Sequence, residues 1–547
     1  MIMAVNADKL LQRLAALRTN RAKWIAVWNG VAKFVFPDAA PVGIVSAVNH
    51  GNKKYQPLDT IGVDCATLLA AFIYSNTIYS GDQWFDLVRS PTSRSDEAPR
   101  AETEFLQKLT QKVLELISNS NFDHVYRQFV ESYVPFGTGV FYWELNDENE
   151  LVCKQWLVTA NIYIAENSSG IVDTVFREFE FTARQAVQQF GYDNVSKSIR
   201  QAFDNPSDSE KRFKFANCVY PRAEAERDKD KTTPKHKKFA DIYIDEAERK
   251  VVLESGRDVF PFCATRFYNM GETYGRSPAM KALPALKAIA VATWAYLKNV
   301  EFNAKPMIFA PPTMYDKIRI EADTVNAWDS GAGDLKIWSP SGDMNSPLEF
   351  AAQKKDEVRR IFYVDRIQYL NEKKMTATEA QLRYDEMIQS FSPVLAALQS
   401  EFFTPFIEGL VAEVVSRKLV DIPESLVENG VLNFKVDYKS RLNAKLKGAF
   451  NANIVTFARL VAEYGQAKGS SAVASVYLND DKIVKEFAKN CNVLGLAVND
   501  DETIERNIEA QAQQAQAAQA AATAKVKPID TQATPAEGSI MQQLMEG

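Results

Sequence analysis

Residues 271–304 read GETYGRSPAMKALPALKAIAVATWAYLKNVEFNA, and this stretch decides how the middle of the chain is organised. Ser277 is a good N-cap and Pro278 suits the first helical position, so a helix is predicted to begin at Pro278 and to run to about Ala304. At 1.5 Å per residue this helix would be about 40 Å long, with a kink at Pro284. Its apolar face repeats at steps of three and four and is formed by Met280, Leu283, Leu286, Ile289, Ala290, Trp294 and Leu297.

The segment 275–279 also comes close to the G-x-S-x-G pattern of a hydrolase nucleophile, with Ser277 in the serine position. In that fold the catalytic His follows the Ser in the chain, but His50, His124 and His236 all precede it. The helix cap is therefore the better interpretation of Ser277. No phosphate-binding G-x-x-x-x-G-K-[ST] motif occurs, and the five cysteines never form C-x-x-C. We therefore predict that the protein is not an enzyme and that it has no catalytic residue, no metal ligand and no cofactor.

A small module follows the helix. Residues 305–350 contain Gly, Pro, Asp and Trp, with short strand candidates at 307–310 and 335–338. A basic helix is predicted at about 354–369, and the polar residues 371–375 interrupt it. The module is thus an insertion between two helices.

A second very long helical segment begins where Thr376 and Glu379 form a capping box. Pro393 and Pro405 are expected to kink or restart it. Its apolar positions continue for about thirty residues and are Tyr384, Met387, Ile388, Phe391, Leu395, Leu398, Phe402, Phe406, Leu410 and Val414.

The two helices that flank the insertion can form an antiparallel pair with the insertion at its tip. Trp294, Leu297, Phe391 and Phe402 are too many large side chains for one such pair to cover. Assembly of several copies around an axis would cover them. In the alternative, the protein is a monomer whose own β-rich part covers these helices.

The first half of the chain predicts an α+β fold. Helices are expected over 6–35, 63–79, 101–134 and 183–190, the last capped by Thr182. Segments rich in β-branched and aromatic residues predict strands at 140–145, 151–158, 162–165, 170–181, 241–244 and 250–254.

Two other segments are dominated by polar residues. The charged run 222–238 is predicted to be an exposed hairpin tip or loop, and DNA binding by its basic end at 235–238 is the alternative. Residues 451–500 predict three short helices, and from Glu509 an Ala/Gln-rich stretch predicts a frayed helix or a mobile tail.

Composition limits the class of protein. The 547 residues suggest three or four domains' worth of chain, and the hydrophobic share of 46% is that of a globular protein. No run of about 18 apolar residues is evident, so no membrane-spanning helix is expected. With 64 Lys and Arg against 70 Asp and Glu, the net charge of −6 argues against a protein that coats duplex DNA.

Several blocks of residues, taken in order, resemble the head-to-tail connector, or portal protein, family of short-tailed bacteriophages. The most specific blocks are 271–278 and 375–380, each at the start of a long helix. The other blocks are the opening helix 13–37, Trp84-Phe85, 163–172 with 182–191, and Val219-Tyr220-Pro221-Arg222. The resemblance covers about residues 6 to 510.

The resemblance implies a portal-type α+β subunit with long stem helices, a small clip, an α/β wing and a helical C-terminal crown region. The implied parts are the wing at 1–276, a stem helix at 277–304, the clip at 305–350, a second stem helix at 351–370, a tunnel loop at 371–376, a long kinked wing helix at 377–420, a helical wing and crown region at 421–508, and the Ala/Gln-rich tail at 509–547.

The family also implies a function. Portals are rings of about twelve subunits at one capsid vertex of the virion, and double-stranded DNA passes through them during packaging and ejection. The implied partners are the terminase motor, tail adaptors that replace it, and capsid and scaffold proteins, with assembly in the host cytoplasm. Another phage head–tail assembly protein, such as an adaptor, is the alternative.

Four residues are candidates for contacts in such a ring. Lys373 and Lys374 in the implied tunnel loop would face the DNA backbone without reading its sequence, and the alternative is that they are solvated loop charges. Trp328 and Trp338 in the implied clip would anchor the terminase or the adaptor, and the alternative is that they pack within the clip or against its neighbours.

Overall fold

A computed structural model of the chain describes most of residues 6–438 and divides the protein into two units, Met1–Ser440 and Arg441–Gly547. In the second unit only Thr456 and Arg459 are described, both in helical conformation. The described ranges are 6–37, 58–78, 83–89, 100–224, 233–305, 307–309, 336–338, 345–368, 377–420, 427–428, 431–432 and 434–438, together with 456 and 459.

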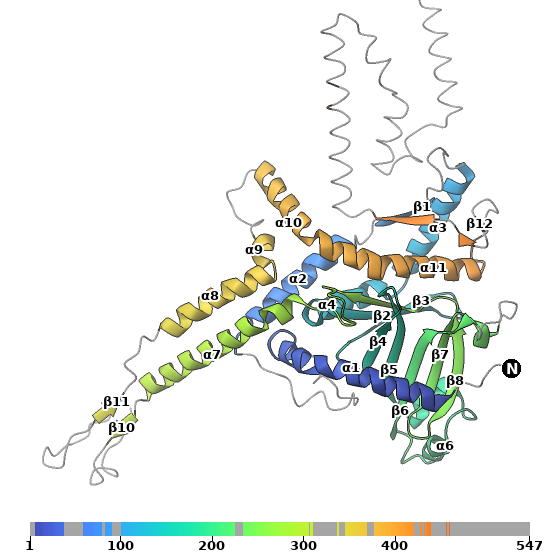
Figure 1. Ribbon diagram of the computed structural model, residues 1–547, viewed down its shortest axis with the longest axis horizontal. Coiled ribbons are helices and arrows are strands. Elements are labelled where there is room, and N and C mark those ends of the chain that lie inside the picture. The colour runs from blue at the N-terminus through green and yellow to red at the C-terminus, as the bar shows by residue number, and fades with distance from the viewer. Residues whose placement is uncertain are drawn as a thin grey trace, which may run out of the picture. The chain divides into compact units, whose positions relative to one another are not determined.

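A five-stranded antiparallel sheet forms one layer of the first unit (Figure 1). Its strand order is β4-β5-β6-β7-β8, so every strand pairs with its neighbours in sequence. The predicted strands are confirmed, and β6 is one that the sequence analysis left out. The strands are β4 Ile162–Glu166, β5 Val172–Thr182, β6 Arg212–Pro221, β7 Phe239–Asp245 and β8 Lys250–Arg257.

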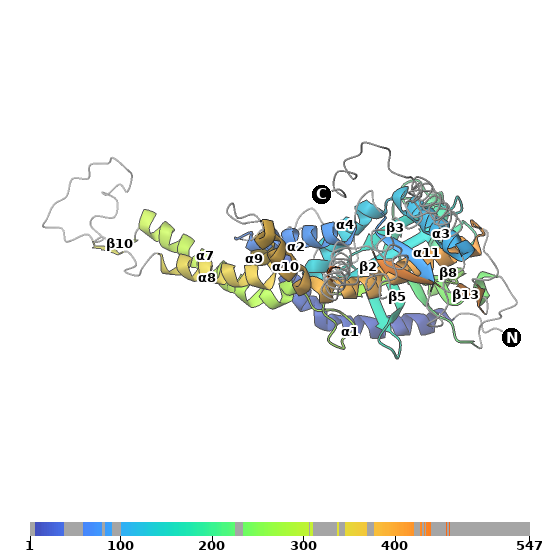
Figure 2. The same cartoon turned by 90° about the horizontal axis from the view of Figure 1, so that it is seen from above.

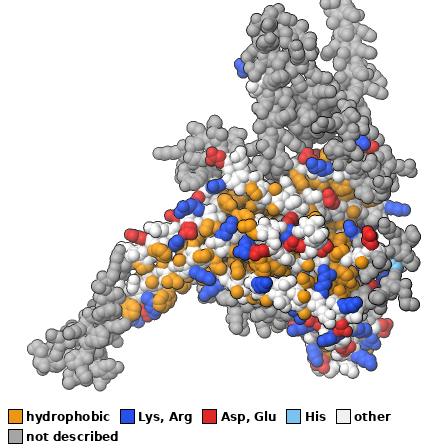
Figure 3. Space-filling model, viewed as in Figure 1, with side chains coloured by type: hydrophobic (Ala, Val, Ile, Leu, Met, Phe, Trp, Pro, Cys, Tyr) orange, Lys and Arg blue, Asp and Glu red, His pale blue; other side chains and the backbone are white. Residues whose placement is uncertain are grey.

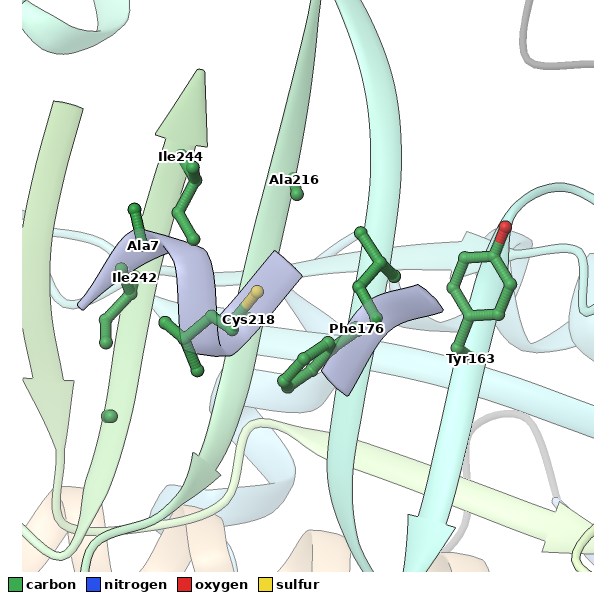
Figure 4. Close-up of a cluster of buried hydrophobic side chains, with 10 residues drawn as sticks. Ala7, Tyr163, Phe176, Ala216, Cys218, Ile242 and Ile244 are labelled. Carbon is green, nitrogen blue, oxygen red and sulfur yellow. The ribbon is translucent and has the colours of Figure 1, made fainter. Parts of the chain in front are cut away.

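Both faces of this sheet are covered, because alternate side chains of each strand point to opposite sides. Helix α1 (Ala7–Phe34) lies across one face, where it buries Phe176, Cys218 and Ile242 (Figure 4). Two short helices, α5 (Ala183–Phe190) and α6 (Lys197–Asp204), cover the other face. The expected cap of α5 is confirmed, since Thr182 and Gln185 form a full capping box.

A second, three-stranded sheet has the order β3-β2-β9 and packs against helices. Its strands are β2 Thr138–Leu145, β3 Leu151–Trp156 and β9 Phe262–Arg266. Helix α4 (Phe122–Phe136) lies against β2 and β3. The contact is an aromatic core of rings 4.8–6.5 Å apart, formed by Phe122, Tyr126, Phe129, Phe141, Phe402 and Phe406.

The helix expected over 101–134 is in fact two helices, α3 (Arg100–Ser118) and α4. Ser120 separates them, because its hydroxyl bonds locally to Ile117 O and to Phe122 N instead of leaving the backbone to continue the helix. The helix expected at 63–79 is confirmed as α2 (Ile61–Thr77).

Residues 427–438, which the sequence analysis placed in a helical region, carry strands instead. β12 (Val427–Glu428) pairs with β13 (Val431–Leu432), and β14 (Phe434–Tyr438) pairs with the distant β1 (Phe85–Arg89). The helical assignment was wrong because the alternating apolar residues of β14 find a strand partner about 350 residues earlier in the chain.

Helices α7 (Pro278–Ala304) and α8 (Ser346–Ile361) run side by side in opposite directions (Figures 1 and 2). Between them the chain forms an antiparallel strand pair, β10 (Met307–Phe309) with β11 (Lys336–Trp338), close to the strands expected in the insertion. α8 begins eight residues before the expected 354, with Pro347 in its first turn. It also ends earlier, at Ile361, and a separate helix α9 (Val364–Gln368) follows.

The long segment after residue 376 forms α10 (Ala377–Leu398), a π-helical turn at Gln399–Phe403, and α11 (Thr404–Ser416). Pro405 restarts the helix at α11, as expected. By length and composition the run Gln389–Ser416 is apolar enough to cross a membrane, which the sequence analysis did not anticipate. We interpret it as a core helix, because 56% of its apolar window is buried inside the protein.

The predicted α+β fold class is therefore confirmed by the elements themselves: two larger antiparallel sheets and three two-stranded ones, together with helices, make up the described residues.

Candidate functional site on helices α7 and α8

The start of α7 meets the end of α4 at a contact between two glycines. Gly137 caps α4 in the left-handed region with φ 72°. A Cβ atom on Gly275 would lie 2.3 Å from the carbonyl oxygen of Gly137, closer than any side chain allows. The backbone N–H of Gly275 donates to Oγ1 of Thr138 over 2.8 Å. Glycine at position 275 thus lets the segment before α7 pass directly over the junction of α4 and β2.

Ser277 is buried at the next step of the same junction and acts as a cap. Its hydroxyl accepts from the backbone N–H of Met280 over 3.0 Å and donates to the carbonyl oxygen of Pro135 over 2.7 Å. Both of these hydrogen bonds join the Ser277 hydroxyl to backbone atoms, and neither involves a histidine. The cap interpretation is confirmed, and the hydroxyl also ties α7 to α4.

Arg266, at the end of β9, is 3% exposed and lies just before this junction. It forms ion pairs with Glu166 over 2.8 Å and with Glu401 of the π-turn over 2.7 Å. The carboxylate of Glu401 also accepts from the backbone N–H of Arg266. The strand that leads to α7 is therefore fastened to the irregular turn between α10 and α11.

Tyr274 connects the junction to α1. Its ring packs edge-on against Trp28 with centroids 5.2 Å apart, and its hydroxyl accepts from the backbone N–H of Ile164. Arg21 lies over the rings of Trp28 and Tyr163 and donates to two backbone carbonyls. Burial lowers the pKa of Arg21, and the nearby tyrosines partly oppose that shift.

The N-terminal half of α7 packs closely against α1 and α2, because small residues line these contacts. A Cβ on Gly30 of α1 would meet Leu283 at 3.0 Å, and a Cβ on Gly62 of α2 would meet Leu286 at 3.1 Å. The buried side chains on α7 are Ala279, Ala282, Ala285, Leu286, Ile289 and Ala292, and those on α8 are Ala351 and Val358.

The C-terminal half of α7 exposes apolar side chains, which we call the apolar stripe and define as Val291, Trp294, Leu297 and Val300. Because these residues recur at three-residue steps, the stripe winds around about half of the helix. Figure 3 shows hydrophobic side chains on the surface of the arm that α7 and α8 form. The exposed fractions are 67% for Val291, 55% for Trp294 and 49% for Leu297. Leu348 and Phe350 of α8 are also exposed. Of the fourteen exposed large hydrophobic side chains in the described residues, six lie on these two helices, so this surface is suited to contact with another protein.

The sequence analysis expected four large side chains to need a partner, and it was right about two. Trp294 and Leu297 are exposed, but Phe391 and Phe402 are 1% and 0% exposed. Phe391 packs on Phe72 of α2, and Phe402 lies in the aromatic core of α4 and β2. Contacts within the subunit thus bury Phe391 and Phe402, and the two of these four residues that stay exposed lie on α7.

The charged side chains of α7 and α8 mostly have partners of opposite sign. Lys355 of α8 pairs with Asp59 over 2.6 Å, which links α8 to the residues just before α2. The hydrogen bond from Lys298 lowers the pKa of Glu301. Pairs within one helix are Lys298–Glu301, Lys354–Glu357 and Asp356–Arg359.

The four residues predicted as a site fall largely outside the described residues. Lys373, Lys374 and Trp328 lie outside them, and so do the tail and the helices expected over 451–500, apart from residues 456 and 459. Trp338 ends β11, where its backbone pairs with Met307.

The charged run 222–238 connects β6 to β7, as expected for a hairpin. Arg222 at its start is 5% exposed and donates to the carbonyl oxygens of Pro234, Lys237 and Ser255. In the basic end, Lys235 pairs with Glu254 and Lys237 with Asp258. These pairs oppose the DNA-binding alternative, because the acidic partners already neutralise part of the positive charge.

The described part of the chain offers no constellation for catalysis or metal binding. It contains no group of three or more His, Cys, Asp or Glu that could hold a metal ion. Burial raises the pKa of the Cys65 thiol to about 12, which leaves little thiolate at neutral pH. A cavity of about 20 Å³ beside Glu144 and Arg417 has room for one water molecule.

The chain belongs to the family described as bacteriophage head to tail connecting protein, which it matches over residues 7–493. It is similar to the probable portal protein of Bordetella phage BPP-1, with 25% identity over 477 residues that cover 84% of this chain and 83% of that protein. It is also similar to the portal protein of Salmonella phage epsilon15, with 24% identity over 523 residues, or 93% and 91% of the two chains. The resemblance noted in the sequence is thereby confirmed.

Two solved structures also show similarity. One is a chain in the virion of a native gene transfer agent particle, with 14% identity, coverage of 78% of this chain and 90% of that chain, and a TM-score of 0.33. The other is a chain in the neck of an empty gene transfer agent particle, with the same identity and coverage and a TM-score of 0.35.

Proposed function

We propose that this chain is one subunit of a portal ring at a single vertex of a phage capsid, through which DNA is packaged and later ejected. Membership of the connector family over residues 7–493 supports this role. Both phage relatives bear the name portal protein, and the similarity extends over most of each, which favours a portal over a shorter adaptor. The proposed role is structural, and the ring acts in the virion after assembly in the host cytoplasm.

The observation that carries the proposal is the apolar stripe of α7. A ring needs a heterologous interface, in which one surface of each subunit contacts a different surface of the next. The stripe projects beyond the part of α7 that α1 and α2 cover, so a neighbouring copy is the partner that would bury it. About twelve copies would close the ring.

The parts of the subunit keep the assignment that the family implies. In this proposal α7 and α8 are the stem, 305–350 is the clip and 371–376 is the tunnel loop. The terminase motor binds the clip during packaging, and tail adaptors replace it afterwards. Capsid and scaffold proteins contact the wing.

The experiment that tests the ring is electron microscopy of the purified full-length chain. We expect end-on particles with about twelvefold symmetry and a central hole. A monodisperse monomer at micromolar concentration, measured by analytical ultracentrifugation, would contradict the proposal.

The role of the stripe is tested by a matched pair of substitutions. Val291→Glu should abolish or strongly reduce ring formation, because it places a charge in an apolar interface. Met270→Glu is the control, since Met270 is also 67% exposed but lies in the segment before α7 and not in the stripe. Equal loss of rings in both variants, or no loss in Val291→Glu, would show that the stripe is not the interface.

The proposed tunnel loop would act through Lys373 and Lys374. Replacing both by Ala should lower the DNA retained in filled heads or change the packaged length, because two positive charges per subunit no longer face the phosphates. If the retained DNA and the packaged length both kept their wild-type values, the assignment of 371–376 as the tunnel loop would be wrong.

The proposed clip would act through Trp328 and Trp338. If either contacts the terminase or the adaptor, its replacement by Ala should weaken binding of that partner to intact rings. Normal partner binding together with broken rings would instead assign the tryptophans to packing within or between clips.

A further inference from the structure

The break between α8 and α9 contains an unusual backbone conformation. Tyr363 has φ 60°, in the left-handed region that large side chains rarely adopt. Such a conformation persists only where surrounding contacts hold it, and it is often part of a conformational device.

The local sequence does not explain the break. Residues 348–368 contain no Gly and no Pro, and the sequence analysis accordingly predicted one helix to about 369. Only Phe362 and Tyr363 separate α8 from α9. Backbone hydrogen bonds resume at once, since the N–H groups of Arg366 and Ile367 both donate to the carbonyl oxygen of Tyr363.

Tertiary contacts of the Tyr363 side chain hold the break in place. Its hydroxyl lies 3.1 Å from the hydroxyl of Tyr268, and its ring packs against Phe391 of α10 with centroids 4.8 Å apart. Tyr268 is fixed in turn, because its backbone forms an antiparallel bridge with Arg276 and its ring faces the ammonium of Lys281 at 3.9 Å.

The neighbours of Tyr363 are anchored as well. Phe362 is 0% exposed and Val364 is 2% exposed, so both residues flanking the break are buried. Arg366 of α9 contacts Ser390 of α10 through a side-chain hydrogen bond.

We propose that Tyr363 is a latched hinge between α8 and α9, and that the hydroxyl pair Tyr268–Tyr363 is its latch. With the latch closed, residue 363 is held in the left-handed region and α9 stays against α10. With the latch open, residue 363 returns to the right-handed region, and α8 and α9 join into one helix from Ser346 to Gln368.

The segment that holds the latch also holds a second irregular element. Arg266, two residues before Tyr268, forms the ion pair with Glu401 in the π-turn between α10 and α11. A movement of residues 266–268 would therefore affect the break at Tyr363 and the π-turn between α10 and α11 at the same time. π-Helical turns inside α-helices are frequent at functional sites.

Spin labels within one subunit test the hinge. Cysteines at Gln353→Cys in α8 and Gln389→Cys in α10 place labels on exposed positions on either side of it. Cys491→Ser is included, and the cysteines at 65, 153, 218 and 263 are buried. Full-length labelled chain is diluted with unlabelled chain, so that distances between copies do not contribute and the result does not depend on ring formation.

Three variants separate the effect of the left-handed backbone at residue 363 from the effect of the side-chain contacts that hold it. Tyr363→Ala and Tyr363→Gly both remove the ring and the latch, but only Gly accepts the left-handed conformation without cost. Tyr268→Phe removes a single hydroxyl and keeps both rings. Near-native circular dichroism, together with native hydrogen exchange in β6 and β7, shows that each variant is folded.

We expect one distance in the wild type and a second population in Tyr268→Phe and Tyr363→Ala. Tyr363→Gly should favour the bent form by about 5- to 30-fold over Tyr363→Ala, which corresponds to the cost of a left-handed residue. Identical distributions for the Ala and Gly variants, or a wild-type distribution for Tyr268→Phe, would overturn the proposal.

Discussion

At the scale of single residues, the start of α7 can approach the end of α4 only because residues 275 and 277 are small. Gly275 passes over Gly137 at a distance that a Cβ would not permit, and Ser277 reaches Pro135 O. The sequence indicated Ser277 as a cap, because the Ser-Pro pattern is local. It did not indicate the role of Gly275, because the atom that excludes a side chain is 138 residues away.

Gly275→Ala is expected to destabilise the protein by about 3 kcal/mol, because the new Cβ overlaps backbone that cannot rotate away. The matched control is Gly271→Ala in the same segment, where the Cβ meets nothing within 4 Å. There only the φ of 75° opposes the substitution, at a cost of about 1 kcal/mol. Urea unfolding of both variants measures the difference, and equal losses would contradict the close contact.

Burial also sets how stability responds to alkaline pH. It raises the pKa of Tyr274 to about 12, above the ordinary value of about 10. Below pH 10 the phenol is neutral in both states. Between about pH 10 and 12 only the unfolded state ionises, so the stability that this group supplies falls as pH rises through that window.

Tyr274→Phe should therefore flatten the fall of the free energy of unfolding between pH 10 and 11.5, by up to about 1.4 kcal/mol per pH unit, as measured by urea unfolding. Tyr296→Phe is the control, because Tyr296 on α7 is only half-buried. An unchanged slope in Tyr274→Phe would show that this phenol does not control the alkaline transition.

At the scale of elements, the starts of α5 and α7 were predictable from the sequence, whereas the start of α8 and the break at Tyr363 were not. The cap of α5 was indicated by Thr182 and that of α7 by the Ser277-Pro278 pattern. The break at Tyr363 and the π-turn at Gln399–Phe403 were not, since residues from β9 and the segment after it hold both. Local propensity favours a continuous helix at the first of these points, and tertiary contacts override it.

The cap of α7 has a measurable effect at this scale. Ser277→Ala should cost about 2 kcal/mol, because it removes the bond to Met280 N and leaves the buried Pro135 O without its partner. Ser196, the N-cap of α6, is also buried but makes no cap bond, so Ser196→Ala should cost less than about 1 kcal/mol. Urea unfolding of both variants compares the two losses of stability. A smaller loss of stability in Ser277→Ala than in Ser196→Ala would contradict the double role of Ser277.

At the scale of the whole molecule, the charge of the chain agrees with the proposed channel. About twelve copies of a chain with a net charge of −6 give a ring of about −72. A strongly basic ring would release counterions from DNA and hold it. A ring of net negative charge lets the duplex slide.

Free rings are therefore expected not to retain duplex DNA in a gel-shift assay at about 150 mM salt, where the Debye length is about 8 Å. A charge-reversed ring, made by replacing several exposed Glu residues such as Glu210 and Glu349 with Lys, serves as the positive control. Tight, salt-sensitive binding by the unmodified ring would argue that its function is to capture DNA.

The sequence by itself determined the α+β class, the start of α7, the paired helices around an insertion and the family, because these depend on local patterns or on ordered blocks of residues. The tertiary structure decided which apolar side chains stay exposed. Phe391 and Phe402 are buried by α2, α4 and β2, while Val291 and Trp294 stay exposed on α7. It also decided the pairing of β1 with β14 and the bend at Tyr363. Those outcomes depend on contacts between residues far apart in the chain, which no local pattern records.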